Sequence, residues 1–196
     1  MKGLNGVQLP EESNGTFVSS TTAKTRRKHE VTVVVMRVAC VLSSVAAVCL
    51  MVTAKEGSTM SIFGFTLPIY SKWSYSDSFE YLVGVCATVA AHSVLQLVIG
   101  ASRLLRKSPV IHSRKNAWLI LVGDQAFAYA LMSAGSAASG DSNLNRTGIR
   151  HSALPNFCKP LHSFCNRVAV SIAFTFVTWF FLAASAVFNV IWLSSH

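Results

Sequence analysis

Residues 31–54 read VTVVVMRVACVLSSVAAVCLMVTA, and residues 117–140 read AWLILVGDQAFAYALMSAGSAASG. Each stretch is long and apolar enough to cross a lipid bilayer, which takes about 20 residues of α-helix. Each also holds one charged residue inside the apolar run, Arg37 in the first and Asp124 in the second. Because an ionised side chain is costly in hydrocarbon, it survives there mainly when it is paired or faces a polar space. The two stretches therefore predict membrane helices whose charges pair with each other.

Two further apolar stretches, residues 81–102 and 168–193, are long enough to span a membrane. The chain has 196 residues and is 52% hydrophobic, so little of it is left for a soluble domain. We expect an all-α membrane protein, a four-transmembrane-helix bundle over residues 31–193. A disordered cytoplasmic tail is expected over residues 1–30, and a short C-terminal stub over residues 194–196. The first span is too long for a signal-peptide core and is expected to stay in the mature protein.

The distribution of basic residues predicts the orientation of the bundle. Lysine and arginine concentrate on the cytoplasmic side of membrane spans. Ten of them lie in the N-terminal tail and the middle connection, against six in the other two connections. Both termini and the middle connection are therefore predicted to be cytoplasmic.

The net charge of +9 does not indicate a nucleic-acid partner, because the basic residues flank membrane spans and no nucleic-acid motif accompanies them. Membrane lipids are the expected counter-ions. The basic run over residues 24–28 either binds acidic lipids or only fixes the topology, and both interpretations stay open. Catalytic, phosphate-binding and zinc-helix motifs are not found, so the sequence gives no support for an enzyme, a cofactor or a bound metal.

The two intramembrane charges are predicted to lie at the same depth. With the orientation above, both of their helices enter from the cytoplasm, and at 1.5 Å per residue each charge lies roughly 10 Å inside. We expect an ion pair of Arg37 and Asp124, extended by His92 and Gln96 of the second span into a polar network. One interpretation is that the network fixes helix packing. The alternatives are a proton or solute pathway and a regulated contact with a partner.

Small residues recur every four positions on the first and third spans. Such ladders let membrane helices approach closely. Either the ladders face neighbours inside one bundle, or they face another protomer. Their members are Ala39, Ser43 and Ala47 on the first span and Ala126, Ala130, Ala134 and Ala138 on the third.

The second outer connection contains two features expected of an extracellular segment. Cys158 and Cys165 would lie outside the reducing cytosol, and we predict a disulfide between them. Zinc binding by these cysteines with a nearby histidine is an alternative on ligand type, although the spacing fits no familiar site. Asn145 begins the sequon Asn145-Arg146-Thr147 and is a candidate for glycosylation, with crowding against the membrane as the opposing factor.

Four segments together resemble the plant Casparian strip membrane domain protein family, in particular its CASP-like members. Two are the stretches around Arg37 and around Asp124 in Val122-Gly123-Asp124-Gln125. The others lead into the second and fourth spans, over residues 75–83 and 164–167. The resemblance covers all four spans and implies a MARVEL-like four-helix bundle with cytoplasmic termini.

The resemblance also implies a function. CASP-like proteins form homo- and hetero-oligomers at the plasma membrane, and the strip-forming members build a platform that organises cell-wall-modifying enzymes. The extended first-loop signature of those members is not found over residues 55–78. The expectation is therefore a multi-pass plasma-membrane scaffold of the general CASP-like kind. A small transporter or channel that uses Arg37, Asp124 and His92 is the alternative.

Overall fold

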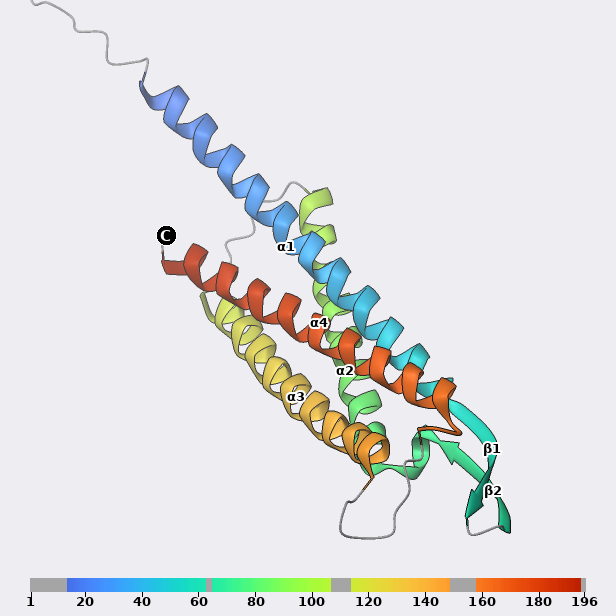
Figure 1. Ribbon diagram of the computed structural model, residues 1–196. Coiled ribbons are helices and arrows are strands. Elements are labelled where there is room, and N and C mark those ends of the chain that lie inside the picture. Colours follow the sequence, from blue (N-terminus) through green and yellow to red (C-terminus); the bar gives the residue numbers. More distant parts are fainter. Residues whose placement is uncertain (1–13, 63–64, 107–113, 149–157, 195–196) are drawn as a thin grey trace, which may run out of the picture.

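The computed structural model describes residues 14–62, 65–106, 114–148 and 158–194. Four long helices make up most of this part of the chain (Figure 1). Their bounds are Asn14–Val52 for α1, Asp77–Arg106 for α2, Arg114–Thr147 for α3 and His162–Ser194 for α4. The four-helix bundle predicted from the apolar stretches is thus the core of the architecture.

The helices are arranged so that each packs on two others. Helix α1 packs against α2 and α4, and α3 packs against the same two helices. In Figure 1, α4 runs between α1 and α3. Helices α1 and α3, which carry the two intramembrane charges, therefore stand diagonally opposite each other in the bundle.

Three of the helices contain segments that are long and apolar enough to cross a membrane by length and composition: Val31–Val52, Asp77–Ser102 and His162–Ile191. The fourth predicted span, residues 117–140 of α3, is not among them, although it is helical throughout. Alanine, glycine and serine replace large aliphatic residues along this helix and lower its hydropathy. The side of the membrane on which the termini lie stays a prediction.

The structure corrects the expected length of the disordered tail. Helix α1 begins at Asn14, so residues 14–30, predicted to be disordered, are helical. Extending an existing helix by one residue adds a hydrogen bond without a new nucleation step. A helix that forms in an apolar segment can therefore continue into the polar residues that precede it. Residues 1–13 lie outside the described part of the chain.

The prediction of an all-α fold was wrong in one place. The first outer connection forms an antiparallel hairpin of β1 (Lys55–Ile62) and β2 (Phe65–Lys72), with Lys55 opposite Lys72. A 3-10 turn, η1 (Trp73–Tyr75), then leads into α2. The hairpin extends from the end of the bundle (Figure 1). Its polar composition hid it from a search for apolar runs, but both strands alternate polar and apolar residues over short distances, as strands do.

The core between the helices is apolar toward the hairpin end. Met51, Phe79, Leu82 and Leu131 are buried there. Close packing of α3 on α4 depends on Gly135, because a Cβ atom at this position would lie 3.2 Å from Cζ of Phe176. A larger residue at position 135 would require the Phe176 ring to move by a few tenths of an ångström.

Candidate functional site

The structure brings the two intramembrane charges together at the centre of the bundle. Nη2 of Arg37 donates a hydrogen bond to Oδ2 of Asp124, and the side chains are 2% and 0% exposed. Because α1 and α3 are diagonally opposite, this ion pair crosses the bundle and links two helices that each pack on α2 and α4. Its position at the bundle centre keeps both charges away from lipid, which lowers their cost.

Helix α2 completes the site from the side. Nε2 of His92 lies 3.1 Å from Oδ1 of Asp124, and Nε2 of Gln96 lies 3.2 Å from the same oxygen. Nε2 of His92 and Nε2 of Gln96 are 2.6 Å apart. Gly123 lies against the ring of His92, and a Cβ atom there would be in ordinary van der Waals contact with it, at 3.4 Å from Cε1. All four residues predicted for the polar network are thus in contact, and we call them the polar layer.

The polar layer is arranged to hold helices together. Three helices converge on one carboxylate, that of Asp124, whose two oxygens accept from Arg37 and face His92 and Gln96. A buried ion pair adds little net stability, but removing one partner leaves a costly unpaired charge. On the hairpin side of the layer the core is filled with apolar side chains. No observation in the described residues favours the transporter alternative.

Helix α4 contributes a line of hydroxyl groups that the sequence interpretation missed. Ser171 Oγ donates to the carbonyl of Ala47 at 2.7 Å, and Thr178 Oγ1 donates to Ser43 Oγ at 2.8 Å. Thr175 Oγ1 lies 3.6 Å from Sγ of Cys86 on α2. Residues 171, 175 and 178 are spaced by four and three, which places them on one helix face. This spacing of Ser and Thr in an apolar span was the available signal.

The small-residue ladders face mainly inward. Ser43 and Ala47 are buried against α4, and Ala134 and Ala138 are buried in the core. Ala39 and Ala130 are partly buried, whereas Ala126 is exposed. The buried members of the ladders therefore pack within the bundle. These members are not available for contact with another protomer.

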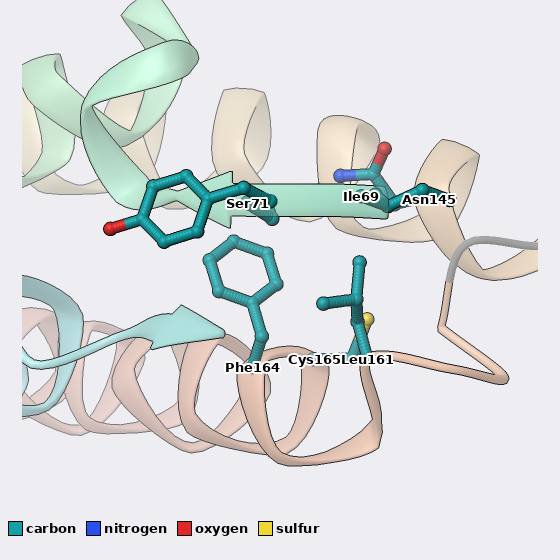
Figure 2. A pocket seen from close by; sticks show the side chains of 7 residues that line it. Ile69, Ser71, Asn145, Leu161, Phe164 and Cys165 are labelled. Atoms are coloured by element: carbon teal, nitrogen blue, oxygen red, sulfur yellow. The ribbon is translucent and has the colours of Figure 1, made fainter. Parts of the chain in front are cut away.

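At the hairpin end, the structure joins Cys158 and Cys165 in a disulfide with a Cα–Cα distance of 5.8 Å. Asn145, the predicted glycosylation site, lies within α3 and lines a cavity of about 210 Å³ with Ile69, Leu161 and Phe164 (Figure 2). Asn145 is only partly exposed, and its glycosylation stays a prediction.

The hairpin is held to the bundle by a carboxylate that the sequence interpretation did not single out. Oε2 of Glu56 accepts a hydrogen bond of 2.7 Å from the backbone N–H of Phe164, in the first turn of α4. Arg167 Nη1 donates to the carbonyl of Thr53 at 2.9 Å, a second link between α4 and the end of α1. A carboxylate at a helix N-terminus satisfies a free N–H group and interacts favourably with the helix dipole.

Glu56→Ala is therefore expected to loosen the hairpin and lower the stability of the protein by about 1 kcal/mol. Thermal unfolding in detergent and hydrogen exchange of the hairpin amides would measure the two effects. Glu80→Ala is the matched control, because Glu80 is also a carboxylate in a first helical turn but is exposed. Equal effects of the two substitutions would contradict the role given to Glu56.

The helices, the apolar spans and the buried ion pair define a multi-pass membrane protein built on a four-helix bundle. Residues 26–181 match the family model of the Casparian strip membrane protein domain. The chain belongs to this family.

Relatives from several plants are similar over nearly the whole chain. CASP-like protein 3A1 of Vitis vinifera is 62% identical over 97% of this chain and 95% of its own length. CASP-like protein 3A1 of Populus trichocarpa is 66% identical over 96% of this chain and 92% of its own length. The Oryza sativa subsp. japonica protein of the same name is 48% identical over 97% of this chain and 93% of its own length. No solved structure matches the chain.

Proposed function

We propose that the protein is a plasma-membrane scaffold that assembles laterally, with copies of itself and with related four-helix proteins, through the outward face of α3. The proposal rests on membership of the family and on one observation about this helix. Polar side chains of α3 point away from the bundle at the depth where the other helices present apolar residues to lipid. Polar groups in hydrocarbon are stabilised by partners on a neighbouring helix.

The outward face of α3 carries a line of polar side chains in the middle of the span, beside exposed apolar residues such as Val122 and Met132. Gln125, next to the buried Asp124, is exposed, and so are Ser133 and Ser136. Tyr129, on the same face, is 68% exposed. Residues 125, 129, 133 and 136 are spaced by four, four and three, so they form one line along the helix. We call this line the α3 seam.

Helices α1 and α4 present a different surface to lipid. The exposed face of α1 consists mainly of aliphatic residues such as Val38, Leu42 and Val45. That of α4 includes Val177, Phe180 and Val187. Membrane helices associate by close packing of small residues and by hydrogen bonds between side chains. The α3 seam combines small residues with side chains that form hydrogen bonds, and its Gln125 has two donors and an acceptor, so we propose it as the contact face for a second bundle.

Energy transfer between donor- and acceptor-labelled copies in liposomes tests the proposal. Wild-type protein is expected to show transfer that rises with the protein-to-lipid ratio. Gln125→Leu with Ser133→Leu should weaken association by about 3- to 18-fold, because interhelical side-chain hydrogen bonds in membranes contribute roughly 0.6–1.7 kcal/mol.

The control is a pair of substitutions on the lipid-facing side of α2. Thr88→Leu with Ala91→Leu changes two exposed residues on that face and should leave the transfer unchanged. Equal loss of transfer in the two double variants would count against the α3 seam. Absence of transfer in the wild type would count against lateral assembly itself.

Fluorescence recovery after photobleaching in plant cells tests the scaffold role directly. Slow recovery of the tagged protein in a bounded patch of the plasma membrane is the expected result, and fast recovery over an even surface would contradict it. As further partners we propose cell-wall-modifying enzymes, which such a patch would retain, and membrane lipids that contact the basic cytoplasmic residues.

A further inference from the structure

Four buried polar atoms lack a hydrogen-bond partner in the described part of the chain. They are Nε and Nη1 of Arg37, Oγ of Ser93 on α2 and Oγ of Ser185 on α4. The exposed fractions of these three residues are 2%, 0% and 0%. Other buried hydroxyls, such as those of Ser44 and Ser171, donate to backbone carbonyls. The four atoms are therefore exceptions that share some local cause.

The contacts of α2 with α4 place Ser93 and Ser185 at similar depth. Cys86 on α2 lies beside Thr175 on α4, and both helices run away from the hairpin end. Ser93 is seven residues beyond Cys86, which makes it level with Leu182, seven residues beyond Thr175. Ser185 lies three residues further along α4, or about 4.5 Å.

The contacts of α1 with α4 place Arg37 at the same depth. Thr178 contacts both Cys40 and Ser43, and α1 runs opposite to α4. Arg37 lies three residues before Cys40 and six before Ser43. Because the helices run in opposite directions, Arg37 is level with α4 residues three to six positions beyond Thr178, which are residues 181–184. A helical side chain also leans toward the N-terminus of its helix, which for Arg37 is the direction of Ser185. All four atoms thus lie within about one helical turn along the bundle axis.

The two serines also point to the bundle interior. Ser93 is seven residues from Cys86, and Ser185 is seven residues from Thr178. Seven residues make nearly two full turns of an α-helix, so each serine shares the face of a residue that contacts a neighbouring helix. Both serines are fully buried, and they replace large apolar residues at the level of the ion pair.

We propose that Arg37, Ser93 and Ser185 form a binding site for ordered water inside the bundle. The Nε and Nη1 hydrogens of Arg37 donate to the water oxygen, and the water donates to the serine hydroxyls. Buried waters typically make about three such hydrogen bonds to protein groups that otherwise lack partners. The charge of Arg37 is already balanced by Asp124, so a neutral ligand fits this site better than an anion, which would add an unbalanced charge in a low-dielectric interior.

The polar layer reaches the surface of the bundle on the α2 side. The side chain of His92 is 20% exposed, whereas Arg37 and Asp124 are buried. His92 and Gln96 lie at the edge of the layer on α2, so their polar atoms connect the central site with the surface of the bundle.

A crystal structure of the full-length protein at a resolution that shows water, with one crystal soaked in bromide, tests the ligand. Density within about 2.7–3.2 Å of Nε or Nη1 of Arg37, without an anomalous bromide signal, is the expected result. A bromide signal at this position would show that the site binds an anion and would overturn the proposal. Clear density for Arg37 without neighbouring density would overturn it as well.

Substitution of the serines provides a second test. Ser93→Ala and Ser185→Ala should each lower the melting temperature by about 2–6 °C, because they remove partners of a buried hydrogen-bonded group. Ser44→Ala is the matched control, because Ser44 is also fully buried but bonds only to Val41 of its own helix. Melting temperatures of the two variants no lower than that of the control would overturn the proposal.

Discussion

Asp124→Leu is expected to destabilise the bundle by about 3–5 kcal/mol, because it leaves the buried guanidinium of Arg37 without its counter-charge. Arg37→Met should have an effect of similar size for the converse reason. The double variant, Arg37→Met with Asp124→Leu, should recover most of the loss, since apolar side chains of similar volume often replace a buried ion pair at little cost.

The free cysteines of the chain provide the measurement. Cys40 and Cys86 are buried, so a fluorogenic maleimide reacts with them as the bundle unfolds on heating. Cys49 is exposed, and Cys49→Ser removes its background signal. A double variant no more stable than either single variant would contradict direct pairing.

Exchanging the two charges is expected to restore less than the apolar replacement does. With Arg37→Asp and Asp124→Arg, the guanidinium would face His92 and Gln96, which surround the carboxylate of the native protein. These two side chains are placed to contact an acceptor at position 124. The difference in unfolding temperature between the charge-exchange variant and the apolar double variant would measure how much His92 and Gln96 of α2 contribute to the site.

Gly135→Leu is expected to separate α3 from α4 and to cost at least about 1–3 kcal/mol. The first added carbon would already lie 3.2–3.3 Å from the ring of Phe176, so the ring must move, and the three further carbons of leucine add to this overpacking. The same cysteine assay should show a lower unfolding temperature.

Gly84→Leu is the control for this substitution. Gly84 lies in an α-helix, as Gly135 does, but nothing lies within 4 Å of a Cβ atom built there. The two substitutions therefore share the change in helix propensity and differ in packing. Similar unfolding temperatures for the two variants would mean that the contact of Gly135 with Phe176 does not limit packing.

The helical part of the fold could be predicted from the sequence because its signal is local. An apolar run of about 20 residues has few stable forms in a membrane other than a helix, since every backbone group must be hydrogen-bonded within the segment. The hairpin over residues 55–72 was missed because its strands are far shorter than the apolar runs that span a membrane, and because β1 is mostly polar. The helical extension of α1 to Asn14 was missed because helix propagation does not require an apolar pattern.

The polar layer could be predicted from the sequence for a similar reason. A charge in an apolar span is rare enough to require a partner, and equal depth on two helices identified Arg37 and Asp124 as candidates. The positions of His92 and Gln96 followed from the same count of residues. The hydroxyls of α4 and the carboxylate of Glu56 were not singled out, because Ser, Thr and Glu are common residues and the partners of these side chains lie on other elements.

The sequence by itself determined the apolar helices, the presence of one buried charge of each sign and the family to which the chain is similar. Only the tertiary structure decided that α1 and α3 are diagonal and that Ser43, Ala47, Ala134 and Ala138 face inward. It also decided that the outward face of α3 carries Gln125. The physical reason is that hydrophobicity and helix periodicity are properties of one segment, whereas the direction that a helix face takes depends on the neighbours packed around it.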